Sequence, residues 1–140
     1  CPPPGMMTFD APDRETCTIR RARTNTPLQA LVLMNDPTYL EASRKLAERV
    51  LKVGNDKDEA RLARLYNFVL YRDPKAAELA TLLPLLNKTR ERYKAAPEKA
   101  MQLLKTGNSP RDEKLDAAEL AAWTTLCSLV LNLDEAITKE

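Results

Sequence analysis

Residues 115–131 read LDAAELAAWTTLCSLVL, and this stretch decides the fold. Asp116 with Glu119 has the spacing of a helix-capping box, and Leu115 is placed to pack on Leu120 as a hydrophobic staple. The apolar side chains that follow recur every three or four residues, as on one helix face: Leu120, Trp123, Cys127, Val130 and Leu131. The stretch therefore predicts a central core helix that begins after Asp116.

Capping signals of the same kind mark two helices nearer the N-terminus. Thr26 offers a hydroxyl cap, Pro27 suits the first helical position, and Gln29 completes a capping box. This first helix is expected to end near Asn35. Asp36 and Pro37 are a second pair of N-cap and first helical residue, and they predict the start of a second helix. Gly54 is its predicted left-handed terminator.

Three more helical segments follow before residue 115. Asp56 with Glu59 predicts the start of one, which YRDP at 71–74 stops. A long helix is expected to begin at Asp73 and Pro74. A short helix is expected to begin at Pro97 and to end at Gly107. NSPRDEK at 108–114 is predicted to be a solvated loop. Five or six helices without an alternating strand pattern indicate an all-α, compact bundle.

The first 25 residues contain Pro2, Pro3, Pro4, Gly5 and Pro12 and lack helical periodicity. They are expected to form an extended arm packed on a single helical domain of residues 26–140. Four apolar side chains are the predicted anchors of this arm: Met6, Met7, Phe9 and Ile19.

Composition excludes several classes of partner. The 140 residues are 44% hydrophobic and 30% charged, which is ordinary for a globular domain, and the net charge is only +2. A charge this small gives no field that favours nucleic acid. No stretch approaches the roughly 20 apolar residues of a membrane span, so no membrane insertion is expected. The basic run KTRERYK at 88–94 is interpreted as a solvated helix face.

The residues also restrict the chemistry. The chain has no histidine, which removes the commonest general base and metal ligand. Cys1, Cys17 and Cys127 are too few and too scattered for a zinc site, so no metal and no cofactor are predicted. Cys127 is interpreted as a small buried hydrophobic residue. Whether Cys17 and Cys127 are paired is left open, and no catalytic constellation is recognised.

Arginines crowd the segment before the first helix, where TIRRARTNTPLQA spans residues 18–30. We expect Arg20 or Arg21 to bind an acidic residue of the same chain and so fix the arm, because the planar guanidinium grips carboxylates with two hydrogen bonds. The expected acidic partners are Asp36, Asp134 or Glu135. The alternative is a small anionic ligand at the helix start. Its candidate binding residues are Arg20, Arg21, Asn25, Gln29, Asn35 and Asp36.

Several motifs carry a family resemblance. They are TNTPLQAL at 24–31 followed by MNDP at 34–37, then LYNFVLYRDP at 65–74, and the closing LNLDE at 131–135. Together with the PPPG opening, these segments resemble the C-terminal part of the planctomycete-specific domain of unknown function 1553. The likeness extends over nearly the whole chain.

The resemblance implies a C-terminal fragment of a larger, exported protein, in which an upstream domain precedes this one and cytochrome c-like modules often occur. It implies an extracytoplasmic, periplasmic location. Because no catalytic constellation is recognised, we expect a non-catalytic structural or interaction domain whose partner is the upstream domain. The alternative is an anionic ligand-binding or enzymatic role, polysaccharide or redox related, shared with that upstream domain. Apolar surface exposed by truncation also predicts that the fragment forms a homodimer.

Overall fold

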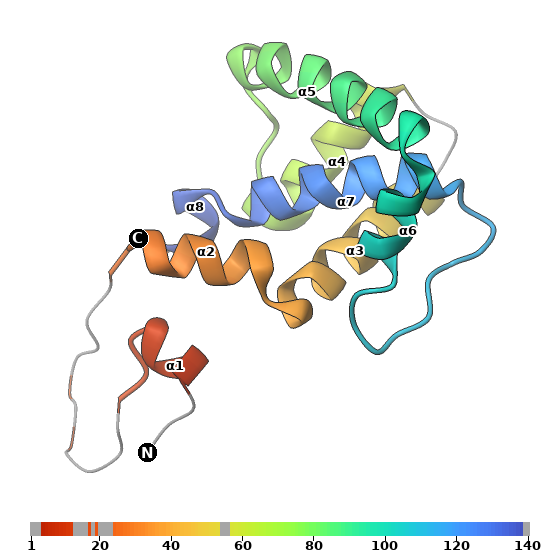
Figure 1. Cartoon of the computed structure of the whole chain (residues 1–140). Coiled ribbons are helices and arrows are strands. Elements are labelled where there is room, and N and C mark those ends of the chain that lie inside the picture. The colour runs from red at the N-terminus through yellow and green to blue at the C-terminus, as the bar shows by residue number, and fades with distance from the viewer. Residues whose placement is uncertain (1–3, 13–16, 18, 20–23, 54–56, 139–140) are drawn as a thin grey trace.

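The computed structural model describes residues 4–12, 17, 19, 24–53 and 57–138. All regular structure in these ranges is helical, which confirms the predicted all-α fold (Figure 1). The longer helices correspond to the six expected, and two short ones are added. In chain order they are α1 (Pro4–Thr8), α2 (Pro27–Asn35), α3 (Pro37–Lys52), α4 (Asp58–Leu70), α5 (Ala76–Ala95), α6 (Pro97–Leu104), α7 (Ala117–Leu131) and α8 (Asp134–Ile137).

Helix α7 is the central element, as the sequence predicted. It packs most extensively against α3, α5 and α6, and Figure 1 shows it running between α5 on one side and α3 on the other. Because neighbours surround it, its buried residues extend beyond one face: Leu120, Ala121, Ala122, Trp123, Thr124, Leu126, Cys127 and Val130. The predicted apolar stripe is therefore too narrow, and Leu131, which belongs to it, is only partly buried.

Three predicted helix starts are confirmed by their hydrogen bonds. The Thr26 hydroxyl accepts the Gln29 N–H at 3.3 Å, and the Gln29 side chain accepts the Thr26 N–H at 2.9 Å. Asp36 accepts the N–H of Thr38 at the start of α3. Asp116 accepts the N–H of Glu119 at 2.9 Å at the start of α7. These caps satisfy amide groups that have no partner within the helix.

Two predicted starts differ from the structure, by one residue for α4 and by two residues for α5. Helix α4 begins at Asp58 with Lys57 as its N-cap, one residue after the predicted position. Helix α5 begins at Ala76 rather than after Asp73, because the Glu78 carboxylate accepts the N–H of Lys75 at 2.6 Å and so fixes the N-cap there. Gly54, the predicted terminator of α3, lies outside the described residues, as Asp56 also does.

The N-terminal arm differs from the expectation of a wholly extended segment, because Pro4–Thr8 form the short helix α1, which packs against α2. Proline is compatible with the first turn of a helix, where its missing N–H would have no partner. Of the predicted anchors, Phe9 packs on Tyr39 with ring centroids 5.9 Å apart. Met6 and Met7 are more than half exposed and Ile19 is fully exposed, so these three are not anchors.

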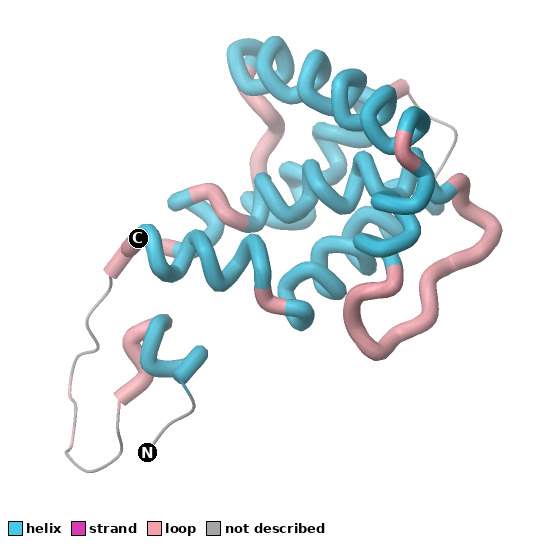
Figure 2. Tube along the Cα trace, in the orientation of Figure 1, coloured by secondary structure: helices cyan, strands magenta, loops and turns pink. Residues whose placement is uncertain are grey.

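The loop of residues 105–116, drawn in pink between α6 and α7 in Figure 2, is tied to α3 rather than freely solvated. Glu41 accepts the N–H groups of Asn108 and Ser109 at 2.8 and 2.9 Å. Arg44 donates to the Ser109 carbonyl at 2.7 Å, and Lys45 to the Pro110 carbonyl. Hydrogen bonds from Ser109 and from the Asn108 N–H lower the pKa of Glu41 to about 2. The predicted solvated loop is thus a structural part of the bundle.

Gly107 allows this attachment, and its replacement tests it. Gly107 has a φ of 96°, and an added Cβ would lie 2.3 Å from Glu41 Oε2. We expect Gly107→Ala to destabilise the chain by about 1–2 kcal/mol, because alanine rarely adopts this backbone conformation and Glu41 would have to move. Gly5→Ala is the matched control, since its Cβ would meet nothing within 4 Å. Urea unfolding followed by circular dichroism measures both; equal losses at the two positions would contradict the explanation.

Candidate functional site

Gln29, one of the candidate ligand-binding residues, is 1% exposed and fully engaged within the chain. Its Nε2 donates to the Thr8 carbonyl at 2.9 Å and to the Thr24 hydroxyl at 3.0 Å, while its Oε1 accepts the Thr26 N–H. Thr24 in turn donates through its N–H and its hydroxyl to Asp10. Gln29 therefore joins the arm to α2, and its amide faces no open cleft.

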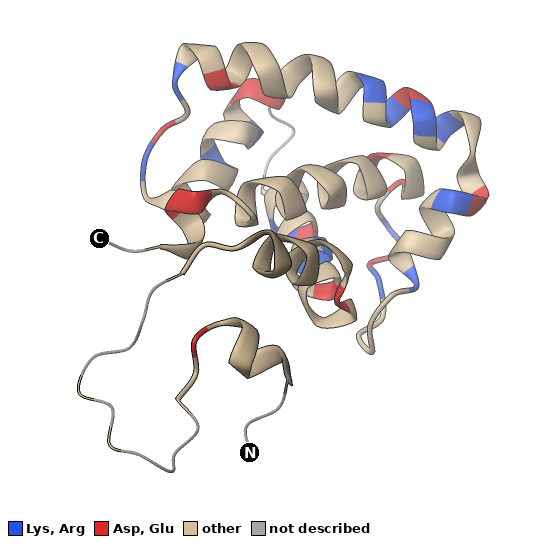
Figure 3. Ribbon diagram, turned by 60° about the vertical axis from the view of Figure 1, so that its left-hand side comes forward, with Lys and Arg blue, Asp and Glu red and all other residues tan. Residues whose placement is uncertain are grey.

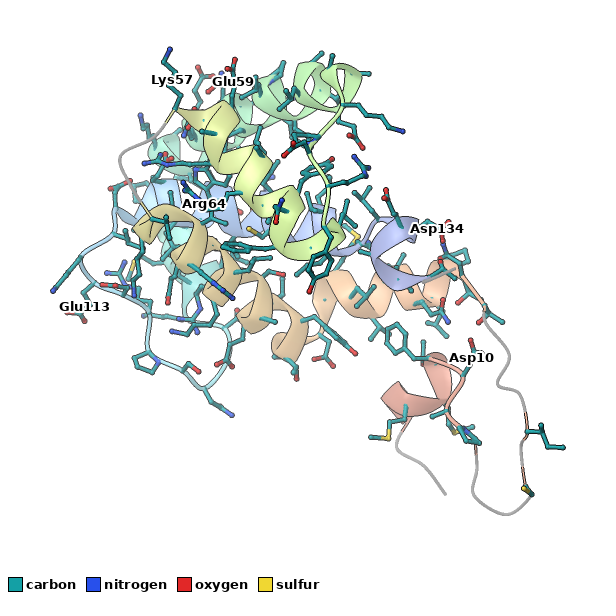
Figure 4. All side chains as sticks on the ribbon, turned by 180° about the vertical axis from the view of Figure 1, so that it is seen from behind. Asp10, Lys57, Glu59, Arg64, Glu113 and Asp134 are labelled. Atoms are coloured by element: carbon teal, nitrogen blue, oxygen red, sulfur yellow. The ribbon has the colours of Figure 1, made fainter. Side chains whose placement is uncertain are left out.

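The other described candidates do not converge on one site. Asn25 donates to Asp134 across the chain, and Figure 4 shows Asp134 on α8, close to the N-terminal end of α2. Hydrogen bonds from Thr138 and Asn25 lower the pKa of Asp134. Asn35 donates to the Leu31 carbonyl one turn earlier, and Asp36 caps α3.

Arg20 and Arg21, on which the hypothesis of internal pairing depends, lie outside the described residues. Their expected acidic partners have other contacts. Asp36 accepts an N–H of α3, Asp134 binds Asn25, and Glu135 binds Arg72.

Two arginine clusters that the sequence analysis missed join separate helices. Arg72 binds Glu78 of α5 and Glu135 of α8, and its guanidinium lies 5.2 Å from the centre of the Tyr66 ring. The Arg72 guanidinium lowers the pKa of Glu78 to about 2. No local sequence pattern predicts this cluster, because Glu135 is 63 residues away from Arg72.

The second cluster centres on Arg90 of α5. It binds Asp58 of α4 and Glu119 of α7 with paired hydrogen bonds, and Glu119 also accepts the indole N–H of Trp123 at 2.8 Å. Arg90 holds the pKa of Asp58 below its usual value. These contacts hold three helices together and leave the guanidinium mostly enclosed, so the cluster is structural.

An exposed apolar stripe runs along α2. Leu28 and Leu31 are each 57% exposed and Met34 is 53% exposed, at the three-residue spacing that places them on one helix face. The opposite face carries the buried Gln29 and packs against α3 and α7. Three large apolar side chains on one exposed face form a surface typical of an interaction site.

This stripe leads into a cavity of about 460 Å³. Its apolar wall comes from several helices: Met34, Leu40, Tyr93, Leu103, Leu129 and Leu133. Its polar groups are Thr124, Thr125, Ser128 and Asn132. A volume and a lining of this kind are usual for binding pockets. The sequence analysis did not find the cavity, because its walls come from segments far apart along the chain.

A second depression, of about 420 Å³, adjoins the first and shares Tyr93 and Leu103 with it. Its remaining lining is polar or basic: Arg92, Lys99, Gln102 and Thr106. The Tyr93 hydroxyl is 3.1 Å from the Thr125 hydroxyl, which fixes the ring between the two depressions. The two adjoining depressions are together called the groove, with the first as its apolar end and the second as its basic end.

The reactive side chains are distributed as follows. Cys17 is exposed and Cys127 is buried, and both are free thiols. Burial raises the pKa of the Cys127 thiol, so that it stays protonated and packs as an apolar residue. Within the described ranges, no group of three or more cysteine, aspartate and glutamate side chains is arranged to hold a metal ion. None of the helices described is both long enough and apolar enough to span a membrane.

Comparison with known proteins identifies the family. No curated protein and no solved structure matches the chain. A family model, described as PSD1, protein of unknown function (DUF1553), matches residues 1–86, which extend from the arm into α5 and include the TNTPLQAL and MNDP motifs. The closing LNLDE motif lies beyond the matched residues. Because the match covers more than half of the 140 residues, the chain belongs to the PSD1 (DUF1553) family.

Proposed function

We propose that this chain is a non-catalytic structural and interaction domain of a larger, exported bacterial protein, and that its partner is the domain upstream of it. The observation that carries the proposal is the exposed stripe of Leu28, Leu31 and Met34 on α2, which continues into the apolar cavity. Apolar surface of this kind is costly to leave in water, and a partner that covers it gains from its burial.

The polar residues of the family motif support the same proposal. Gln29 and Thr26 bind each other, Asn25 binds Asp134, and Asp36 caps a helix. These contacts occupy polar groups of Asn25, Gln29 and Asp36, which were candidates for binding a small anionic ligand. The motif then serves to shape the start of α2 and to set its apolar face outward. An enzymatic or ligand-binding role would instead need those groups to be directed into a cleft.

Oxidative footprinting of Met34 tests the proposal. We expect hydroxyl radicals to oxidise Met34 several-fold more slowly in the complete protein than in the isolated 140-residue chain, because the upstream domain covers α2. Tyr71 is the internal reference, since it is 85% exposed at the end of α4 and is not part of the stripe. Mass spectrometry of the digested samples measures both rates. Equal Met34 rates in the two samples would reject the proposal.

A further inference from the structure

The groove is flanked by basic residues at one end, a feature that the apolar stripe alone does not explain. Residues 88–105 contain six basic and two acidic side chains, although the whole chain carries only +2. Figure 3 shows the blue lysine and arginine segments on the C-terminal half of α5 and on α6. Of these six basic residues, Arg92 and Lys99 line the basic depression.

Two of these cations are available to a partner. Arg92 and Lys99 are exposed and line the basic depression, and neither forms an ion pair with any residue that the structure describes. The Arg92 guanidinium lies 6.0 Å from the centre of the Tyr93 ring. Arg90, two residues before Arg92, is by contrast bound to two carboxylates. The charge at the groove end is thus not neutralised by the described parts of the chain.

The apolar end has the features of an anchor pocket. Leu129 is 40% exposed at the cavity, and Leu40, Leu103 and Leu133 extend the apolar wall. A pocket of this kind accepts a large aliphatic or aromatic side chain, and such buried anchors dominate the energy of many interfaces. A carboxylate at the neighbouring basic end gains charge-assisted hydrogen bonds, for which the planar guanidinium of Arg92 is suited.

We infer that this groove binds an acidic amphipathic segment of a protein partner, which inserts one large apolar side chain into the cavity and places carboxylates against Arg92 and Lys99. The inference rests on the proposed interaction function and names the chemistry of the partner. The mode is that of an amphipathic helix in a groove.

The apolar surface favours a protein segment over a small apolar acid. A small molecule fills the cavity alone, whereas the stripe continues past Met34 to Leu31 and Leu28 on α2. A segment of several turns covers both the cavity and part of this stripe. Nucleic acid is disfavoured because Tyr93, the aromatic residue shared by the two depressions, is 8% exposed and offers no stacking face.

A peptide selection tests the inference without a known partner. A displayed library of random peptides of about 15 residues, roughly four helical turns, is selected against the chain. A parallel selection uses the double variant Arg92→Glu, Lys99→Glu. We expect the first selection to enrich acidic peptides with large apolar residues at three- and four-residue spacing. We expect the double variant to lose these peptides and to enrich basic ones.

The matched control is Lys57→Glu, which reverses an exposed charge at the N-terminal end of α4, outside the groove lining (Figure 4). It should select the same acidic peptides as the unchanged chain. Fluorescence anisotropy of one enriched peptide should then show affinity at least about tenfold weaker for the double variant, and weaker binding at higher salt. Leu129→Asn, which adds no charge, should weaken the same peptide by a factor that does not depend on salt.

Three results would overturn the inference. One is failure of the library to enrich any peptide, and another is enrichment of the same peptides by the unchanged chain and the double variant. The third is that light scattering shows the unchanged chain to be a dimer and the double variant to be a monomer. The occupant of the groove would then be a second copy of the chain. If any of these occurs while Met34 remains covered in the complete protein, the proposed function stands and only the chemistry of the partner is wrong.

Discussion

Replacing Trp123 with alanine will cost the chain about 3–5 kcal/mol of unfolding free energy, the largest single-residue effect we expect. Trp123 is fully buried on α7, which packs against α3, α5 and α6, and its indole N–H donates to Glu119 at 2.8 Å. Alanine would leave a large cavity and remove this hydrogen bond. A domain of ordinary stability, about 5–15 kcal/mol, would be left close to unfolding.

Urea unfolding followed by circular dichroism measures this loss, because Trp123 is the only tryptophan and its fluorescence disappears with the substitution. Leu129→Ala is the control on the same helix; at 40% exposure it should cost less than about 1 kcal/mol. Trp123→Phe keeps most of the volume and should lose about 1–2 kcal/mol, which keeps the test usable if the alanine variant does not fold. Similar losses for Trp123→Ala and Leu129→Ala would contradict the central position of α7.

Replacing Arg90 with methionine is expected to destabilise the chain by about 2–3 kcal/mol. Arg90 is 17% exposed and pairs with Asp58 and Glu119, which are 30% and 26% exposed. Methionine would leave the partly buried carboxylates of Asp58 and Glu119 near each other without the Arg90 cation. Arg61 would remain beside them, at 3.8 Å from Asp58 and 4.0 Å from Glu119. Removing one partner from an enclosed charge cluster is costly because the remaining charges stay desolvated.

Arg92→Met, two residues further along α5, is the control and should change stability by less than about 0.5 kcal/mol, since Arg92 is exposed. Adding Asp58→Asn and Glu119→Gln to Arg90→Met should recover part of the loss, because neutral amides tolerate the missing cation. If Arg90→Met unfolds at the same urea concentration as Arg92→Met, the cluster contributes nothing to stability.

The loss should also depend on pH with a definite sign. Arg90 lowers the pKa of Asp58 in the folded chain below its ordinary value of 3.8. A lowered folded pKa means that the stabilisation is present above pH 3.8 and disappears as the pH falls through the folded value. The difference between the unchanged chain and Arg90→Met should therefore be large at pH 7 and narrow in strong acid.

Three of the predicted N-caps are confirmed in the structure. Thr26 with Gln29, Asp36 before Pro37, and Asp116 with Glu119 all cap the helices expected of them. The prediction failed at Asp73, because the Glu78 carboxylate accepts the N–H of Lys75 and so places the N-cap two residues later, at Lys75. Competing local acceptors of this kind cannot be ranked from the order of residues alone.

The candidate site was less predictable. Gln29 was expected at a ligand site or in the helix cap, and the structure adds its bonds to Thr8 and Thr24. The groove was not predicted at all, because Met34, Leu103 and Leu129 have no sequence signal in common. KTRERYK was interpreted as one solvated face, yet Arg90 is enclosed in a charge cluster, while Arg92 lines the basic depression.

By itself, the sequence determined that the chain is helical, where α2, α3, α6 and α7 begin, and that residues 115–131 form the core element, because capping and periodicity act within one or two turns. Only the tertiary structure decided that α7 is buried on several faces, that Glu41 binds the loop after α6, and that Leu28 and Leu31 of α2 are exposed. These features depend on contacts between residues dozens of positions apart, and such contacts are set by how whole helices fill space against one another.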